Sequence, residues 1–324
     1  MAALPVGVIG VGALGRHHAR HLAQAANARL VGVHDLDPVR GRQVAEGCGV
    51  RFYDDLDALL SAVEAVSVAV PTPAHAEVGI RALARGRAVL MEKPLAASLE
   101  EADALLEAAS RSGVPLVVGH VERFNRAVRA ARPYLGDPRY LESDRLAPFQ
   151  PRGTDVAVVL DLMIHDLDLI LHLTGGSAPV DVRASGIAVL SAHLDMANAR
   201  VEFPTGAVAN VTASRMARER VRRLRIFQPD GYLSLDLGDG TGEFMRLRDG
   251  WRESGGQRLE EIVERVILTA PDADALALEL ASFVRVAGGA AESVVTGVEG
   301  RAALALALEV TEAVQRTPVP GPHR

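Results

Sequence analysis

The chain has 324 residues, which is too long for one ordinary hydrophobic core and therefore predicts two domains. Apolar residues make up 48% and charged residues 23%, and the formal net charge of −6 argues against a nucleic-acid or anionic-membrane partner. The single cysteine, Cys48, excludes an internal disulfide framework and a multi-cysteine metal site. No basic segment precedes the first apolar run, and no stretch approaches the ~20 apolar residues of a membrane helix, so we expect a cytoplasmic protein.

A glycine-rich motif follows the first apolar run. Residues 10–15 read GVGALG, between the apolar residues 6–9 and residues 16–26, which can form a helix. In a dinucleotide site the first glycine turns the chain sharply, the second lets the backbone approach a pyrophosphate, and the third allows close helix packing. The motif alone also occurs in ordinary turns, but its place between a strand and a helix predicts a dinucleotide site.

Asp35 bears on the choice of cofactor. It lies 20 residues after Gly15 and directly follows a second apolar run. A carboxylate there accepts hydrogen bonds from ribose hydroxyls and repels a 2′-phosphate, which favours NAD over NADP. The alternative role, capping the next helix, suits Asp37 better because Pro38 follows it.

Up to residue 120, strands are expected to alternate with helices. Apolar runs that read as buried parallel strands lie at residues 6–9, 29–33, 65–70, 88–91 and 115–118. Ser98 and Glu101 form a capping box, and Thr72 is expected to cap a helix that ends near Gly86. Such alternation predicts an α/β Rossmann domain with a doubly wound parallel sheet.

After residue 120 the pattern changes to α+β. We expect one helix over residues 156–173 and two more near residues 273–287 and 297–315. Strand-like segments fall within residues 180–236, at 199–203, 207–214, 222–227 and 232–236, and short turns separate them. They predict an open, mainly antiparallel sheet whose uncovered face pairs with another subunit in a homodimer or homotetramer. The predicted domains are residues 1–121 for NAD and 122–316 for substrate and oligomerisation, with a Pro-rich, disordered tail over residues 317–324.

Two sets of residues can carry chemistry. Lys93 follows the strand predicted at residues 88–91, where ligands gather in open α/β sheets, although a surface lysine in a turn is the plain alternative. Asp161 and His165 lie four residues apart and share one helix face. The ordinary pKa of histidine, about 6.5, suits proton transfer near neutrality. A buried structural histidine is the alternative, and a metal site is disfavoured because no second histidine cluster has ligand spacing.

Other polar positions have two possible roles. Thr72 and His75 follow the third predicted parallel strand, and His120 follows the fifth, so each either borders the cofactor or supports the fold. An arginine cluster alternates largely as a strand face does, at Arg218, Arg220, Arg222, Arg223 and Arg225. We interpret it first as a solvated or interface face; the alternative is that it holds a substrate phosphate.

Taken together, these residues resemble the glucose–fructose oxidoreductase/inositol dehydrogenase/MocA (Gfo/Idh/MocA) family over nearly the whole chain. The resemblance lies in the glycine motif, the Thr72–His75 turn, the Glu-Lys-Pro sequence at residues 92–94 and the Asp161/His165 pair. It implies that Lys93, Asp161 and His165 are catalytic and that the Lys93–Pro94 bond is cis. The cofactor residues that we predict are Gly10, Gly12, Ala13, Leu14, Gly15, Asp35, Val70, Pro71, Thr72, His75, Glu92, Lys93 and His120. The predicted substrate contacts are Lys93, Arg123, Asn125, Arg152, Asp161 and His165.

Three further segments narrow the resemblance. Residues 119–125, 161–168 and 225–232 are similar to family members that oxidise the 3-hydroxyl of UDP-N-acetylglucosamine. The sequence therefore predicts an NAD-dependent oxidoreductase that converts a secondary hydroxyl of a sugar or nucleotide sugar to a ketone by hydride transfer. Two alternatives stay open: a dehydrogenase for inositol, another polyol or a free sugar, and a catalytically silent NAD-binding sensor.

Overall fold

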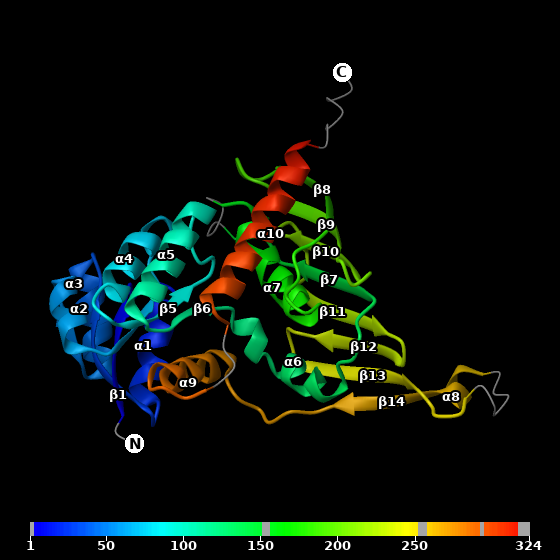
Figure 1. Ribbon diagram of the computed structural model, residues 1–324, viewed down its shortest axis with the longest axis horizontal. Helices are drawn as coiled ribbons and strands as arrows, with labels where there is room; N and C mark the ends of the chain where they lie inside the picture. The colour runs from blue at the N-terminus through cyan, green and yellow to red at the C-terminus, as the bar shows by residue number, and fades with distance from the viewer. Residues whose placement is uncertain (1–2, 151–155, 252–257, 292–294, 317–324) are drawn as a thin grey trace. The chain divides into compact units, whose positions relative to one another are not determined.

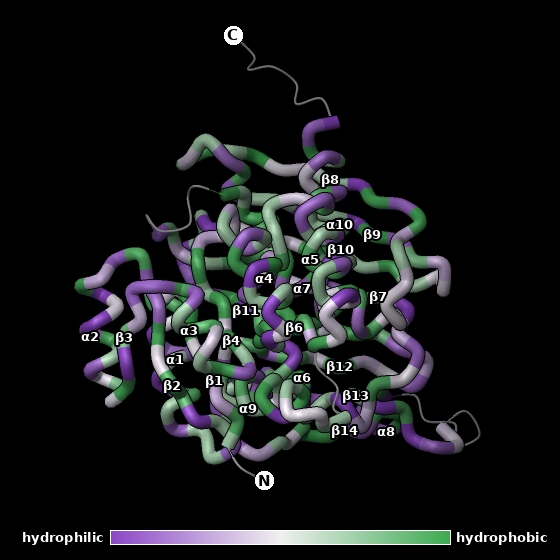
Figure 2. The backbone as a smooth tube through the Cα atoms, turned by 60° about the vertical axis from the view of Figure 1, so that its left-hand side comes forward, coloured by the Kyte–Doolittle hydropathy of each residue, from purple (hydrophilic) through white to green (hydrophobic). Residues whose placement is uncertain are grey.

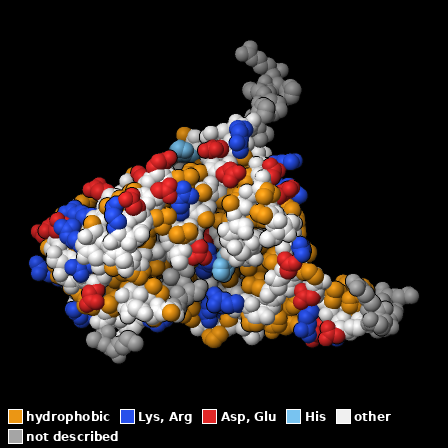
Figure 3. Space-filling model, viewed as in Figure 1, with side chains coloured by type: hydrophobic (Ala, Val, Ile, Leu, Met, Phe, Trp, Pro, Cys, Tyr) orange, Lys and Arg blue, Asp and Glu red, His pale blue; other side chains and the backbone are white. Residues whose placement is uncertain are grey.

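The computed structural model describes residues 3–150, 156–251, 258–291 and 295–316. The chain divides into two compact units, Met1–Phe124 with Ala273–Leu304, and Asn125–Asp272 with Ala305–Arg324. The tail predicted to be disordered, residues 317–324, lies outside the described residues. No described helix combines the length and the apolar character needed to span a membrane. On the face drawn in Figure 3, basic and acidic side chains are intermingled.

The first unit is built on a six-stranded parallel sheet with the order β3-β2-β1-β4-β5-β6 (Figure 1). Its strands are β1 (Leu4–Ile9), β2 (Ala28–His34), β3 (Arg51–Tyr53), β4 (Ala65–Val68), β5 (Ala88–Glu92) and β6 (Leu116–Gly119). Its main helices are α1 (Gly15–Gln24), α2 (Pro38–Cys48), α3 (Leu56–Ala62), α4 (His75–Leu83), α5 (Leu99–Ser112) and α9 (Ala275–Ala287). The predicted doubly wound sheet is confirmed; the short strand β3 was not predicted.

Local signals explain where the helices of this unit begin. Asp37 accepts hydrogen bonds from the N–H groups of Val39 and Arg40, so it caps α2 as predicted. Ser98 accepts from the N–H of Glu101 and caps α5, also as predicted. The predicted cap at Thr72 is wrong, because a 3-10 turn, Thr72–Ala74, precedes α4. No described side chain caps α4, whose first residue is His75.

The second unit is built on an eight-stranded sheet with the order β14-β13-β12-β11-β7-β10-β9-β8. Its strands are β7 (Tyr140–Leu146), β8 (Asp181–Ile187), β9 (Met196–Glu202), β10 (Val208–Ser214), β11 (Val221–Gln228), β12 (Gly231–Asp236), β13 (Thr241–Leu247) and β14 (Val263–Leu268). Within the described part of this second sheet, only β7 and β10 pair in parallel, so the predicted mainly antiparallel sheet is confirmed. Strands β7, β13 and β14 were not predicted.

Helices cover one face of this sheet. They are α6 (Arg126–Ala131), which packs on β12 to β14, and α7 (Ile164–Leu173), which packs on β7 and β10 (Figure 1). The short α8 (Leu259–Ile262) precedes β14, and α10 (Gly297–Arg316) begins in the first unit and ends in the second. Along β7, Leu141 is buried and its neighbours Tyr140 and Glu142 are half-buried, the alternation of a sheet with one covered face. The hydropathy of the chain along these elements is drawn in Figure 2.

Candidate active site

The glycine loop fits a dinucleotide. Gly10 has a φ of +80°, and a Cβ there would lie 2.8 Å from the Ala69 carbonyl oxygen. A Cβ on Gly15 would lie 1.8 Å from the Gly10 carbonyl oxygen, so only glycine lets α1 start this close to the loop. A Cβ on Gly12 would meet nothing within 4 Å, which leaves the backbone open to a pyrophosphate. Ala13 and Leu14 are exposed on the same loop, and no described side chain caps α1.

Asp35 follows β2, and its carboxylate accepts hydrogen bonds from nearby groups of the protein. Its Oδ2 accepts from the N–H of Val11 at 2.8 Å and from Arg40 Nε at 3.1 Å. Its Oδ1 accepts from the N–H of Asp37 at 2.8 Å and from Arg40 Nη2 at 2.6 Å. Burial by itself raises the pKa of Asp35, but the hydrogen bonds from Arg40, Asp37 and Val11 bring that pKa below its ordinary value. A carboxylate has about four acceptor positions, so a ribose hydroxyl must displace Arg40 to reach Asp35.

The loop after β4 is tied to the loop after β5 by His75. Its Nδ1 lies 2.9 Å from the Pro94 carbonyl oxygen and its Nε2 lies 3.0 Å from the Val70 carbonyl oxygen. The ring is 1% exposed, and this burial lowers the pKa of His75. His75 thus fixes the two loops, whereas Thr72 is half-buried and Pro71 is exposed beside it. The predicted contact of His75 with the cofactor stays a prediction.

A buried pair lies beneath Lys93. His18, fully buried in α1, places its Nδ1 2.7 Å from Ser67 Oγ and its Nε2 2.9 Å from Glu92 Oε1. The other oxygen of Glu92 accepts from the N–H of Lys93 at 3.2 Å. Burial raises the pKa of Glu92, but the contacts with His18 and Lys93 outweigh it and lower that pKa. Glu92 therefore supports the backbone of Lys93, whose own side chain is half-buried.

The sheet brings most predicted cofactor residues to one edge. Gly10 follows β1, Lys93 follows β5 and His120 follows β6, and all three strands run in the same direction. Their carboxyl ends therefore share one edge, and the strand order reverses between β1 and β4, where dinucleotides bind in such sheets. The Lys93–Pro94 bond is cis, as the resemblance implied.

In the second unit, Asp161 and His165 lie on an irregular helix. The predicted continuous α-helix from residue 156 is wrong, because a π-helical turn, Val159–Met163, precedes α7. Such turns often occur at functional sites. Asp161 and His165 are both half-buried, whereas Met163 and Ile164 between them are buried. The predicted pair thus lies on the accessible side of the helix.

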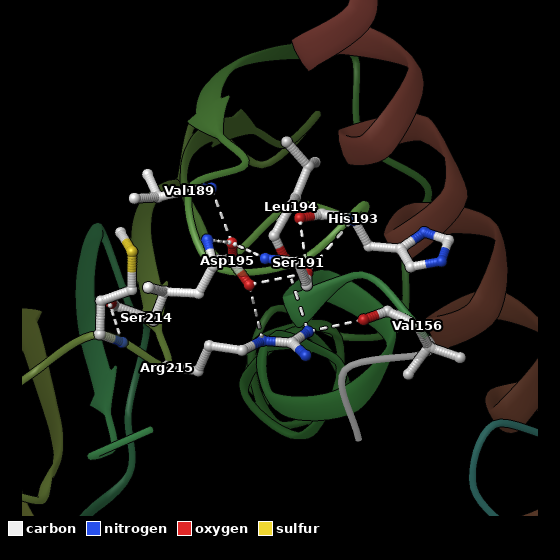
Figure 4. Close-up of polar contacts among 10 residues, drawn as sticks. Val156, Val189, Ser191, His193, Leu194, Asp195, Ser214 and Arg215 are labelled. Carbon is white, nitrogen blue, oxygen red and sulfur yellow. Dashed lines mark hydrogen bonds and ion pairs between the residues drawn. The ribbon is translucent and has the colours of Figure 1, made fainter. Parts of the chain in front are cut away.

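Buried ion pairs hold this helix in place. Arg145 on β7 donates from Nε and Nη2 to the carboxylate of Asp166, at 2.6 and 3.1 Å, and both residues are buried. Arg215, directly after β10, donates from Nη2 to the Val156 carbonyl at 2.6 Å, and its Nε lies 3.7 Å from Asp195 (Figure 4). These contacts fix the chain on both sides of Asp161.

Asp195 organises the turn that faces Arg215. Its Oδ2 accepts from the N–H groups of Val189, Leu190 and Ser191 at 2.7, 2.6 and 3.0 Å (Figure 4). Burial acts to raise the pKa of Asp195, but these hydrogen bonds lower it to about 2. Asp195 therefore stays ionised beside Arg215 at neutral pH.

A pocket of about 460 Å³ lies within the second unit. Asp161 and Leu162 line it together with four arginines, at positions 145, 215, 220 and 222. The sequence singled out Arg220 and Arg222 as part of a cluster. It gave no signal for Arg145 and Arg215, because each is defined by a carboxylate partner distant in sequence.

Two predicted substrate residues make contacts within the protein. Arg123 donates from Nη1 to Glu299 at 2.9 Å. Asn125 caps α6 through its Oδ1 and donates from Nδ2 to the Leu237 carbonyl at 2.8 Å. Arg152 lies outside the described residues. Substrate contact by these three residues stays a prediction.

Comparison with known proteins agrees with this geometry. A family model described as "Oxidoreductase family, NAD-binding Rossmann fold" matches residues 4–120, and the Gfo/Idh/MocA C-terminal domain model matches residues 126–234. The UDP-N-acetylglucosamine 3-dehydrogenase of Acidithiobacillus ferrooxidans is 42% identical over 316 residues, 97% of this chain and 98% of that protein. A solved structure of that enzyme superposes with a TM-score of 0.88 at 41% identity, covering 97% of this chain and 99% of that one.

A second group of relatives carries another name. The inositol 2-dehydrogenase of Rhizobium meliloti is 27% identical over 319 residues, 93% of this chain and 94% of that protein. Both of these relatives are named as dehydrogenases, and both match along nearly the whole chain. With a nicotinamide-dinucleotide-binding Rossmann unit followed by the family's C-terminal domain, the chain belongs to the Gfo/Idh/MocA family of oxidoreductases.

Proposed function

We propose that this protein is an NAD-dependent dehydrogenase that oxidises the 3-hydroxyl of UDP-N-acetylglucosamine, or of a close nucleotide sugar, to a ketone. The observation that carries the proposal is the 42% identity, over nearly the full length, with a dehydrogenase of that name. The inositol dehydrogenase that matches over a similar length is 27% identical, so a polyol substrate is the second candidate.

The chain's own residues can supply the proton chemistry. His165 takes the proton of the substrate hydroxyl, because an imidazole that is only partly buried is a suitable base near neutrality. Asp161, one turn earlier and also half-buried, orients the substrate or the imidazole. Lys93 stabilises the oxygen as negative charge develops on it. NAD, when bound, supplies the hydride acceptor.

Lys93 has a chemical distinction from every other basic residue. It is the only lysine among the 324 residues, and the other cationic side chains are arginines and histidines. An arginine cannot lose its proton in a protein, whereas a lysine can exchange one when its surroundings lower its pKa. The lysine at position 93 can therefore stabilise an alkoxide while it is positively charged, and it can also exchange a proton.

The carboxylate at the end of β2 supports the proposal of NAD rather than NADP. Asp35 presents a carboxylate in the place where a 2′-phosphate would lie, and its lowered pKa keeps it charged. The glycine loop, the Val70–Thr72 segment and Lys93 complete the proposed cofactor contacts. The role of residues 1–121 in binding NAD and of residues 122–316 in binding substrate is part of the same proposal.

The uncovered face of the second sheet is the proposed subunit interface. Tyr140, Phe227 and Tyr232 form a cross-strand row on this face, with ring centroids 5.7 and 5.2 Å apart. Half-buried aromatic side chains on an open sheet suit pairing with a second copy in a homodimer or homotetramer. Light scattering on Phe227→Glu would then report a smaller particle than the wild type; an unchanged mass contradicts this interface.

One assay tests the proposed function. The protein is mixed with NAD and, separately, with UDP-N-acetylglucosamine and myo-inositol, and NADH absorbance is followed. We expect kcat/KM for the nucleotide sugar to exceed that for inositol by at least about tenfold, the worth of one good polar contact. Oxidation of inositol alone overturns the substrate, and NADH binding without turnover of either compound supports a sensor instead.

A further inference from the structure

We propose that Arg220 and Arg222 form a diphosphate subsite in the pocket that also contains Asp161, so that the substrate is held by the diphosphate of a nucleotide sugar. This inference rests on the proposed function and assigns its substrate recognition to named residues. It also gives a role to part of the arginine cluster that sequence alone interprets as a solvated or interface face.

The charge of the pocket is the first argument. Its charged lining residues are four arginines and one aspartate. Two of the arginines, Arg145 and Arg215, face the carboxylates of Asp166 and Asp195, so a formal excess of one positive charge is left. The whole chain has a net charge of −6, so this local excess runs against the overall balance. Cationic side chains gathered in one concave site repel one another, and a bound anion relieves that repulsion.

The four arginines divide into two pairs with different surroundings. Arg145 and Arg215 are buried, 3% and 5% exposed, and each faces an internal carboxylate, Asp166 or Asp195. Arg220 is exposed, and it makes no ion pair with the residues that the structure describes. Arg222 is half-buried at the start of β11. Internal carboxylates therefore hold the first pair, whereas Arg220 and Arg222 are the more exposed pair.

The register of the sheet places Arg222 on the side of the sheet where the pocket lies. It lies opposite Arg145 in the pairing of β11 with β7. It also alternates with Arg223 along β11, two positions before the buried Leu224, so it lies on the helix-covered face. Arg223 and Arg225 lie on the uncovered face and line a different depression. The cluster therefore splits, and only Arg220 and Arg222 belong to the pocket with Asp161.

The ligand chemistry follows from these side chains. The planar guanidinium donates two parallel hydrogen bonds to phosphate oxygens, and two such groups suit the adjoining phosphates of a diphosphate. A pocket of about 460 Å³ lies in the range used for small ligands. A neutral polyol gains nothing from the positive charge, so the pocket favours a phosphate-bearing sugar over inositol.

Calorimetry on the NAD-loaded protein tests this subsite with UDP as the probe. Arg220→Gln and Arg222→Gln should each weaken UDP binding about tenfold, as expected for loss of a charge-assisted hydrogen bond, and the double variant should weaken it further. Arg223→Gln is the matched control, because it removes the same charge from the adjacent position on the opposite face. Its UDP affinity should equal that of the wild type. Equal UDP affinity in the double variant and in Arg223→Gln overturns the proposal.

The source of the phosphate is settled by parallel titrations. UDP-N-acetylglucosamine and UDP should lose affinity in the double variant, whereas N-acetylglucosamine should show the same weak binding in all proteins. Preferential loss for N-acetylglucosamine 6-phosphate, with UDP unaffected, would assign the arginines to a phosphate monoester and overturn the diphosphate. In the wild type, UDP should also protect Arg220 and Arg222 from phenylglyoxal, measured by peptide mass spectrometry; unchanged modification counts against the subsite.

These results are distinguishable from failure of the proposed function. If UDP binds through the two arginines but UDP-N-acetylglucosamine yields no NADH, the subsite stands and the proposed reaction fails. If the wild type and the double variant oxidise UDP-N-acetylglucosamine with the same kcat/KM, the reaction stands and the subsite fails.

Discussion

His18 Nε2 lies 2.9 Å from Glu92 Oε1, and the other oxygen of that carboxylate accepts the N–H of Lys93. A residue of the helix after the glycine loop is thereby connected to the residue that we propose stabilises the reacting oxygen. Gly119, at the end of β6, lies close to the same carboxylate, because a Cβ there would lie 3.1 Å from Glu92 Oε1. The buried pair thus ties together the ends of three elements of the first unit.

The first prediction concerns this pair. His18→Ala leaves Glu92 buried without its partner and should lower the free energy of unfolding by about 3–5 kcal/mol, measured in urea. His17→Ala, at the half-exposed neighbouring position, is the control and should change it by less than about 0.5 kcal/mol. Adding Glu92→Gln to His18→Ala should restore part of the loss; strictly additive losses would show that the two side chains do not interact.

A second prediction concerns Arg40, which covers the carboxylate of Asp35. Arg40→Ala exposes the negative charge, so the dissociation constant for NADPH should rise about tenfold while that for NADH does not rise. Fluorescence titration measures both constants. Arg42→Ala, an exposed position on the same helix, should change neither. Tighter NADPH binding in Arg40→Ala contradicts the assignment.

The third prediction uses the single lysine. Reductive methylation with a ¹³C label can modify only Lys93 and the terminal amine, so one side-chain NMR signal reports the lysine directly. Bound NAD together with substrate should slow labelling of Lys93, and the labelled enzyme should lose turnover. Full labelling of Lys93 with turnover retained would remove this residue from the reaction.

The fourth prediction separates catalysis from cofactor binding. His165→Ala should lower kcat by about 10²–10⁴-fold, the usual contribution of general acid–base catalysis, because no group then takes the hydroxyl proton. NADH affinity should stay at the wild-type value in a fluorescence titration. His172→Ala, later on the same helix, serves as the control for helix stability. Intact turnover in His165→Ala would show that another group is the base.

A fifth prediction follows from the pKa of Asp195, which is lowered from 3.8 to about 2. A lowered folded-state pKa stabilises the protein above pH 3.8, and that contribution disappears as the pH falls toward 2. The free energy of unfolding should therefore fall more steeply between pH 4 and 2 in the wild type than in Asp195→Asn. Parallel slopes for the two proteins would contradict the lowered pKa.

The sequence predicted the parts of the fold that depend on local patterns. Continuous apolar runs identified β1, β2, β4, β5 and β6, because strands buried on both faces need apolar side chains at every position. Strand β7 escaped notice because its uncovered face and its covered face both carry polar residues, including the buried Ser143 and Arg145. Those residues are tolerated inside only because partners from distant parts of the chain meet them.

The same distinction applies to the site. Lys93, Asp161 and His165 were predicted because their motifs are local. His18 could not be, since its contact with Ser67 spans 49 residues and nothing near either residue signals it. Arg145 likewise depends on Asp166, 21 residues away across a strand and a helix. The π-helical turn at Asp161 was missed because the apolar spacing there is equally typical of an α-helix.

The central claim is that the enzyme removes a hydride from C3 of a nucleotide sugar. It is tested most directly with UDP-N-acetylglucosamine that carries deuterium at C3, or at C4 as the control, by measuring the mass of the reduced cofactor. The account predicts singly deuterated NADH from the C3-labelled substrate and unlabelled NADH from the C4-labelled one. Unlabelled NADH from the C3-labelled sugar, or no NADH from either, would contradict it.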